Sequence, residues 1–135
     1  MERYNVVLVF NEEMDQLLMC KRAKNPYKGL LNLVGGKIEK NEDDLSAAYR
    51  ELLEETGIDE SCISLHKLME FQYPFSQISL QAFVGKVNQN VDLIPEVNEL
   101  LWVSTEENLF DMSRFAGEGN IGHMVEQALY YKEQF

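Results

Sequence analysis

The sequence contains few of the residues that define several large classes of protein. It has only two cysteines, Cys20 and Cys62, among 135 residues, so a disulfide framework is excluded as the basis of the fold. No apolar run approaches the roughly 18 residues that a transmembrane helix needs, and the N-terminus lacks the pattern of a signal peptide. We therefore expect a cytoplasmic protein that does not associate with membranes.

Positive charge is also scarce. The chain has 12 Lys and Arg against 23 Asp and Glu, which gives a formal net charge of −11. A surface that coats a nucleic-acid polymer or an anionic membrane needs a basic patch, and this composition argues against one. An acidic protein can still bind phosphates when metal ions neutralise both partners. The length and the 45% hydrophobic content predict one globular domain over residues 1–135.

The order of apolar segments predicts alternating strands and helices. Residues 42–56 and the segment from Ile121 onward have helical periodicity, and a short helix is expected near residues 105–110. Residues 115–120, with two glycines, predict a mobile loop. This order favours an α/β or α+β fold over a helical bundle. Strands are expected at residues 4–10, 16–22, 30–34, 64–73, 78–87 and 99–104.

The most informative stretch is the predicted helix that follows Gly35 and Gly36. Asn41 or one of the acids after it is a plausible N-cap, and Gly57 suits the residue that ends the helix. One face carries three carboxylates at spacings of i, i+3 and i+4, which is either a solvated acidic face or a set of oxygen ligands for Mg²⁺. Those carboxylates belong to Glu51, Glu54 and Glu55. The opposite face forms a predicted core stripe of Leu45, Ala48, Tyr49, Leu52 and Thr56, with Leu53 at its margin.

The wider spacing favours the second interpretation. Glycine, five residues, glutamate, seven residues, then Arg-Glu-Leu-Leu-Glu-Glu-Thr-Gly-Ile resembles the complete motif of the Nudix hydrolases. The resemblance implies a mixed sheet between helices, an α/β/α sandwich. It also implies a metal-dependent pyrophosphohydrolase that cleaves a nucleoside diphosphate linked to another group. The fixed positions are filled by Gly36, Glu42, Arg50, Glu51, Leu52, Glu54, Glu55, Gly57 and Ile58.

The resemblance also assigns roles to residues of the motif. It implies that Glu54 and Glu55 are the principal ligands of Mg²⁺ or Mn²⁺, with the carbonyl of Gly35 nearby. It implies that Glu51 is a further ligand or the base that activates water. Arg50 would hold a carboxylate in place, or form only a surface pair with Glu54. The remaining fixed residues, Gly36, Glu42 and Gly57, would be structural.

Residues outside the motif are weaker candidates. Some relatives use one further acid, and here either Glu96 or Glu99 could supply it, with family-like spacing before Trp102 slightly favouring Glu99. Arg22 and Lys37 could meet phosphate or be solvated. Asn120 could read a purine edge, although a helix N-cap is the preferred interpretation. His66 and His123 are expected to be structural, and Cys20 a buried thiol.

The sequence does not select one substrate. Our first prediction is a small nucleoside triphosphate, and its base could be an oxidised one. An ADP-ribose or nucleotide-sugar pyrophosphatase and a nucleotide sensor without turnover are the alternatives. The chain departs from frequent family residues at Leu31, Val34 and Asn41, which weakens transfer of a named substrate. Aromatic residues alternate at Phe71, Tyr73 and Phe75 and could stack on a base or form a packed sheet face.

Overall fold

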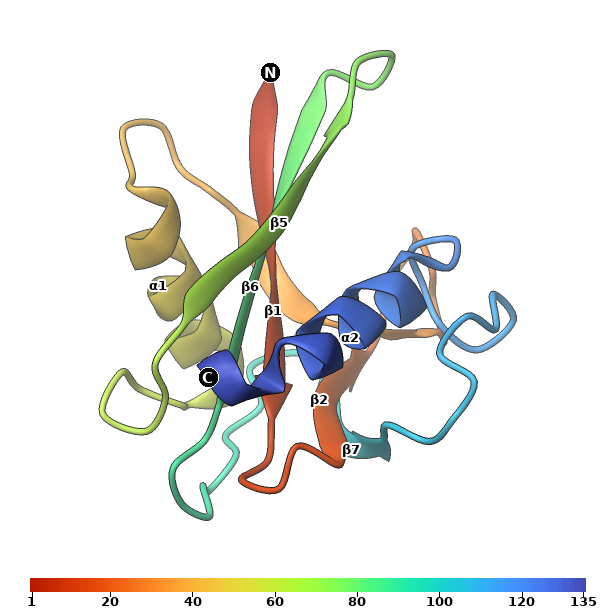
Figure 1. Cartoon of the computed structure of the whole chain (residues 1–135). Helices are drawn as coiled ribbons and strands as arrows, with labels where there is room; N and C mark the ends of the chain where they lie inside the picture. The colour runs from red at the N-terminus through yellow and green to blue at the C-terminus, as the bar shows by residue number, and fades with distance from the viewer.

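The computed structural model describes all residues from 1 to 135. Its centre is one seven-stranded sheet, with helix α1 and helix α2 packed on its two faces (Figure 1). Neither helix is long and apolar enough to cross a bilayer. The elements are β1 (Glu2–Phe10), β2 (Gln16–Lys21), β3 (Leu31–Asn32), β4 (Val34–Lys37), α1 (Asp44–Thr56), β5 (His66–Tyr73), β6 (Ile78–Lys86), β7 (Glu99–Ser104), α2 (Asn120–Tyr130) and a final 3₁₀ turn (Lys132–Gln134).

Strand β1 organises the sheet because it pairs along both of its edges. On one side it runs parallel to β6 over its whole length, and β6 pairs antiparallel with β5. On the other side its first half pairs antiparallel with β4, and its last residue, Phe10, pairs with Leu17 of β2. Strand β2 then leaves β1 and pairs with β7 and β3. The sheet is therefore mixed, as predicted.

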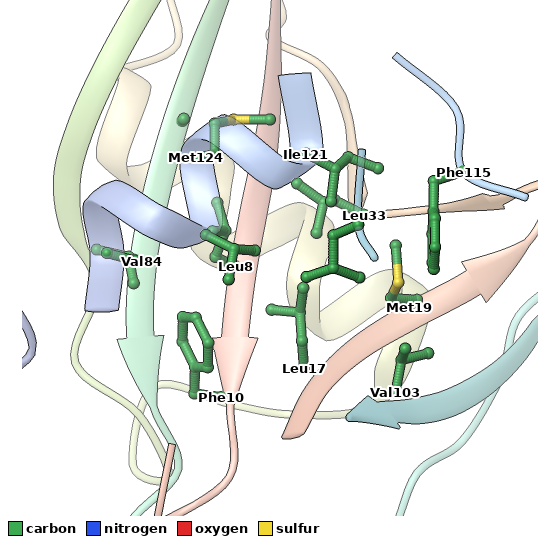
Figure 2. Packing of buried hydrophobic residues seen from close by; sticks show 14 of the residues in the cluster. Leu8, Phe10, Leu17, Met19, Leu33, Val84, Val103, Phe115, Ile121 and Met124 are labelled. Atoms are coloured by element: carbon green, nitrogen blue, oxygen red, sulfur yellow. The ribbon is translucent and has the colours of Figure 1, made fainter. Parts of the chain in front are cut away.

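The alternation of side chains along β1 builds two cores. Val7 and Val9 face α1 and pack in a cluster with Ala48 and Leu52 of that helix. Leu8 and Phe10 point to the opposite face. There they join apolar residues from β2, β6, β7 and α2, among them those drawn in Figure 2. Because both faces of β1 are buried, the strand reads as a continuous apolar run. The predicted sandwich of a mixed sheet between helices is confirmed.

Local signals define both ends of α1. The Asp43 carboxylate caps the helix by accepting the Ser46 N–H at 3.1 Å, so one of the acids after Asn41 is the cap. Gly57 has φ +80° and its N–H reaches the Leu53 carbonyl, which ends the helix as expected. Asn41 has φ +69°, a left-handed conformation that asparagine tolerates. Leu45 was wrongly placed in the core stripe, because it lies on the exposed side of the helix.

Three further expectations from the sequence are wrong. Residues 105–110 form turns and bends, not a helix. The Gly35-Gly36 pair lies inside β4, where it is paired with β1, and does not follow a strand. Asn120 is the first residue of α2 but does not cap it, since the N-cap is Gly119 and no side chain caps the helix. Local propensity does not anticipate these features because each depends on contacts with distant segments.

Candidate active site

The site begins where β4 passes between β1 and α1. Gly35 has φ +151°, and a Cβ added there would lie 2.2 Å from the Asn5 carbonyl oxygen. A Cβ on Gly36 would lie 2.5 Å from the carboxylate carbon of Glu51. Real Cβ atoms do not approach that closely, so both positions need glycine for close approach. The second glycine makes the space in which the Glu51 carboxylate rests against the sheet.

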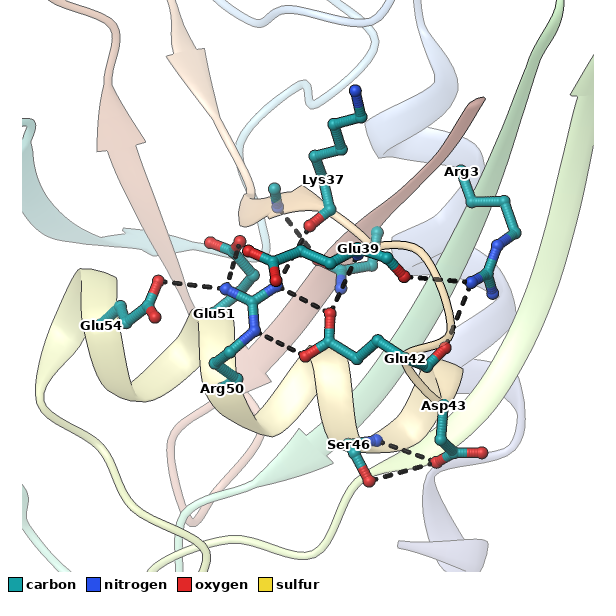
Figure 3. A network of polar contacts seen from close by, with 11 residues as sticks. Arg3, Lys37, Glu39, Glu42, Asp43, Ser46, Arg50, Glu51 and Glu54 are labelled. Carbon is teal, nitrogen blue, oxygen red and sulfur yellow. Dashed lines mark hydrogen bonds and ion pairs between the residues drawn. The ribbon is translucent and has the colours of Figure 1, made fainter. Parts of the chain in front are cut away.

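Arg50 gathers three carboxylates of the motif around one guanidinium group (Figure 3). Its Nε and Nη2 donate to Glu42 at 2.6 and 2.9 Å, a bidentate pair. Its Nη1 donates to Glu51 at 3.0 Å and to Glu54 at 3.2 Å. Nη2 also reaches the Lys37 carbonyl. Arg50 is thus more than an i,i+4 surface partner: it ties α1 to the segment that enters it.

The network assigns Glu42 a structural position. One Glu42 oxygen accepts the backbone N–H of Glu39 at 3.0 Å, while both oxygens accept from Arg50. These bonds favour the charged carboxylate and lower the pKa of Glu42 to about 2. The ion pair therefore persists throughout the neutral range. It closes the loop of residues 38–43 onto the helix and holds the Arg50 side chain in one place.

Glu55 differs from the other two acids because it points inward. Burial is the main cause that raises its pKa to about 7, and the charges of Glu51 and Glu96 raise it further. Contact with the Gly35 backbone and the charge of Arg22 act in the opposite direction. A carboxylate that is costly to ionise in the protein alone is well placed to accept a cation. The predicted proximity of Gly35 to this acid is present in the structure.

Two cavities meet at Glu55. The larger has a volume of about 660 Å³ and lies between β1, β4 and the start of α2. The smaller has a volume of about 250 Å³ and lies beside the loop that precedes β7. Glu55, Arg22 and Asn98 line both. Of the three acids on this helix face, Glu55 therefore lies at the junction between a large chamber and a small one, whereas Glu51 and Glu54 line neither.

The basic side chains differ in whether they line the two cavities. Arg22 lines both cavities, and its Nε donates to the Pro26 carbonyl at 3.2 Å. Lys24, which the sequence did not single out, lines the smaller cavity with it. Lys37 lines neither, and its Nζ pairs with Glu2 at 3.2 Å. The structure thus brings Arg22, and not Lys37, to the carboxylates.

The two candidate acids outside the motif, Glu96 and Glu99, differ in their position relative to Glu55. The Glu96 N–H donates to the Glu55 carbonyl at 3.3 Å, and the Ile94 N–H donates to the Thr56 carbonyl at 2.8 Å. These bonds fasten the loop of residues 88–98 to the end of α1, and Glu96 lines the smaller cavity. Glu99 opens β7 opposite Lys21 and lines neither cavity. Only Glu96 lies beside Glu55.

Polar contacts between distant segments cross the larger cavity. The Tyr27 hydroxyl donates to Glu118 at 2.5 Å, and the Asn120 amide donates to the Tyr73 hydroxyl at 2.9 Å. All four residues line the cavity. Phe71 packs against the apolar core, whereas Phe75 is fully exposed in the turn, so the predicted aromatic face extends to Tyr73 only. Neither tyrosine contact has a signal in local sequence.

The carboxylate oxygens at this site are suitable ligands for a hard divalent cation. Glu51 rests in the space left by Gly36, and Glu55 is an inward carboxylate without a cationic hydrogen-bond partner. No three acid, thiol or imidazole groups form a ready-made cluster, because Arg50 draws Glu51 and Glu54 to itself. A cation bound beside Glu55 would compete with Arg50 for these two acids.

Replacing Gly36 by alanine tests the close approach to Glu51. The new methyl group would require the carboxylate to move, since it would otherwise lie 2.5 Å from the carboxylate carbon. We expect metal-dependent turnover to fall by about 10²-fold or more, because misplacement of a catalytic group by 1 Å can cost that much. Steady-state kinetics and a thermal melt would check this. Unchanged turnover in a well-folded Gly36→Ala protein would contradict the assigned position of Glu51.

Comparison with known proteins agrees with this geometry. The profile of the family described as NUDIX domain matches residues 1–121. The chain is 33% identical over 73 residues to the 8-oxo-dGTP diphosphatase of Escherichia coli, a match that covers 53% of this chain and 57% of that protein. It is 43% identical over 47 residues to the ADP-ribose pyrophosphatase of Methanocaldococcus jannaschii, covering 35% and 28% of the two chains.

The fold has solved counterparts as well. The crystal structure of a C. elegans Ap4A hydrolase binary complex superposes with a TM-score of 0.77 and 15% identity, and the match covers 100% of both chains. The chain spans a little over half the length of the E. coli relative and less of the archaeal one. The family profile covers nearly the whole chain and includes every residue of the motif around α1. This chain therefore belongs to the NUDIX domain family.

Proposed function

We propose that the protein is a metal-dependent pyrophosphohydrolase that acts on a nucleoside triphosphate, including one with an oxidised base. The observation that carries the proposal is the position of Glu55 between two chambers of different chemistry. The larger chamber, with Tyr73 and Asn120 in its wall, has room and polar groups for a base and sugar. The smaller one, with Arg22 and Lys24, suits the terminal phosphates.

Glu55, which lies between the chambers, and the acids beside it would hold Mg²⁺ or Mn²⁺. Glu51, Glu54 and Glu55 are the proposed ligands, with the Gly35 backbone beside Glu55 and with Glu96 as the additional acid. When bound, the cation polarises a phosphoryl oxygen, lowers the pKa of water and neutralises the repulsion between substrate and acids. Glu51 is proposed as a further ligand or as the base that takes a proton from the attacking water, and the position of its carboxylate against Gly36 supports either role.

Arg22 and Arg50 have different proposed tasks. Arg22 faces both chambers and would contact the phosphate chain directly. Arg50 is saturated by carboxylates and the Lys37 carbonyl, so it would organise the acids without touching substrate. Glu99 and Lys37, which lie away from both chambers, are left out of the proposed site. Asn120 is proposed to read the base edge after it leaves Tyr73.

The setting follows from charge and size. The net charge of −11 supports small nucleotides over nucleic-acid polymers as substrates, and we propose that the protein acts in the cytoplasm. The partial matches to an 8-oxo-dGTP diphosphatase and an ADP-ribose pyrophosphatase support both the triphosphate and its main alternative. A sensor without turnover is disfavoured because every acid of the motif is present.

One substrate panel separates these possibilities. Canonical dNTPs, 8-oxo-dGTP, ADP-ribose, nucleotide sugars and dinucleoside polyphosphates would be incubated with the protein and Mg²⁺ or Mn²⁺, and products quantified by chromatography. We expect a triphosphate to give the highest kcat/KM and to yield a monophosphate and pyrophosphate. Preference for ADP-ribose would reject the triphosphate and retain the reaction class. Calorimetric binding without any product at high protein concentration would overturn hydrolysis in favour of sensing.

A further inference from the structure

A row of polar residues crosses the sheet beneath α1. Gly36 of β4 is the register partner of Asn5 of β1, Asn5 is the partner of Gln81 of β6, and Gln81 is the partner of Glu70 of β5. Side chains of register partners lie on the same face of a sheet. Asn5 shares its face with Val7 and Val9, which pack against α1. The row therefore lies on the side of the sheet from which Glu51 approaches.

Two atoms of this row are buried without a hydrogen-bond partner. They are the Asn5 Nδ2 donor and the Gln81 Oε1 acceptor, on side chains that are 2% and 3% exposed. The other atom of each amide is engaged: Asn5 Oδ1 accepts the Gly36 N–H at 3.0 Å, and Gln81 Nε2 donates to Ser79 at 2.9 Å. A buried polar group without a partner destabilises the folded state, so two such groups on register partners call for an explanation.

Glu51 approaches the Asn5 end of the row at Gly36. Its carboxylate carbon lies 2.5 Å from the position that a Cβ of Gly36 would occupy. Asn5 Oδ1 accepts the Gly36 N–H, so the Asn5 amide and the Glu51 carboxylate both adjoin Gly36 on the same face of the sheet. The Glu51 carboxylate has one hydrogen-bonding partner in the structure, Arg50 Nη1 at 3.0 Å. Its remaining acceptor positions are available to a second donor.

We propose that Asn5 is a positioning residue for Glu51. One Nδ2–H of Asn5 holds the carboxylate against Gly36 when Glu51 turns from Arg50, while Oδ1 keeps the Gly36 backbone in place. Gln81, the register partner of Asn5, would accept the second Nδ2–H at Oε1 after rotation of the side chains, which would give each of the two buried atoms a partner. The proposal rests on the proposed function for its kinetic consequence, but the contact itself is independent of any substrate.

The contact is measured first in the protein without substrate. The side-chain amide signals of Asn5 would be assigned by nuclear magnetic resonance in wild type and in Glu51→Gln, each with and without Mg²⁺. We expect both amide protons to be protected from solvent exchange, and one of them to shift strongly in Glu51→Gln and on addition of Mg²⁺. The same signals would be recorded in Gln81→Leu. If the Asn5 amide signals shift in Gln81→Leu but neither in Glu51→Gln nor on addition of Mg²⁺, the proposal is overturned.

Kinetics then test the consequence. Asn5→Asp retains an acceptor for the Gly36 N–H and removes the donor, whereas Val103→Ala weakens a core contact far from Glu51 and serves as the control for stability. We expect Asn5→Asp to lower kcat about 10–100-fold with little change in KM, the effect typical of partners that orient metal-site residues. A loss of kcat no greater than that of Val103→Ala would overturn the proposal. Wild type inactive on the whole panel would instead reject the proposed function, and the resonance experiment would still decide the contact.

Discussion

Glu54→Gln and Glu55→Gln should each lower metal-dependent turnover by about 10²–10⁴-fold. Each change removes one charged oxygen and leaves the shape of the side chain, so the loss reports on charge and ligation. A metal ion contributes several kcal/mol of transition-state stabilisation, and every 1.36 kcal/mol corresponds to a factor of ten. Glu51→Gln should also reduce turnover strongly, since its carboxylate is proposed as ligand or base.

The three acids should differ in how their loss affects the rest of the protein. Glu54 is half-exposed and contacts Arg50 at 3.2 Å, so Glu54→Gln should scarcely change the melting temperature. Glu51 is far less exposed and packs on Gly36, so its replacement should alter the site locally. Turnover by each variant would be measured with Mg²⁺ and Mn²⁺ titrations, which reveal whether excess metal restores the rate.

Lys40→Ala is the matched control, because this exposed residue lies in the loop before α1 and outside the fixed motif positions. It should retain nearly full activity. Near-normal rates in both Glu54→Gln and Glu55→Gln would show that this helix face is not part of the active site. The site would then have to be sought elsewhere on this acidic protein.

Sequence was most informative where a feature depends on residues close together in the chain. The acid face of α1 and the role of Gly57 follow from helical spacing and from local backbone preferences, and the structure has both. The cap at Asp43 was one of the positions expected for the same reason. Strand positions were predicted from short apolar runs, whereas the parallel pairing of β1 with β6 was not predicted.

Contacts between distant segments could not be predicted from local sequence patterns. The sequence slightly favoured Glu99 over Glu96, but the bond from the Glu96 N–H to the Glu55 carbonyl brings Glu96 beside Glu55. Asn120 was expected to cap α2, but its amide meets Tyr73, which is 47 residues away in the chain. The burial of Asn5 likewise follows from the register of β4, β1 and β6 and from no property of its neighbours.

The second large effect concerns stability without metal. The pKa of Glu55 is raised to about 7, mainly by burial, whereas an unfolded glutamate has a pKa near 4.5. At pH 4 both states hold the proton and Glu55 costs little. As the pH rises through 4.5 to above 7, the unfolded chain loses the proton first, and the folded state is increasingly destabilised. Glu55→Gln removes this cost.

We therefore expect Glu55→Gln to be more stable than wild type in EDTA at pH 8, by roughly 1–3 kcal/mol, and about equal to it at pH 4. Relief of like-charge repulsion with Glu51 contributes in the same direction. Thermal and denaturant melts across this pH range would measure the difference. Glu60→Gln, on an exposed residue just beyond α1, is the control for loss of one negative charge.

Adding Mg²⁺ should make wild type more stable than Glu55→Gln, which reverses their order of stability in EDTA. The ion binds the folded site and scarcely the unfolded chain, so it stabilises wild type in proportion to ln(1 + [Mg²⁺]/Kd), where Kd is the dissociation constant. Glu55→Gln lacks one ligand and should gain much less, so the two melting curves should cross as Mg²⁺ increases. A loss of several kcal/mol by Glu55→Gln in EDTA would instead make Glu55 a buried structural partner. Equal gains from Mg²⁺ in both proteins would place the ion elsewhere, because a carboxylate that does not bind the ion cannot change its stabilising effect.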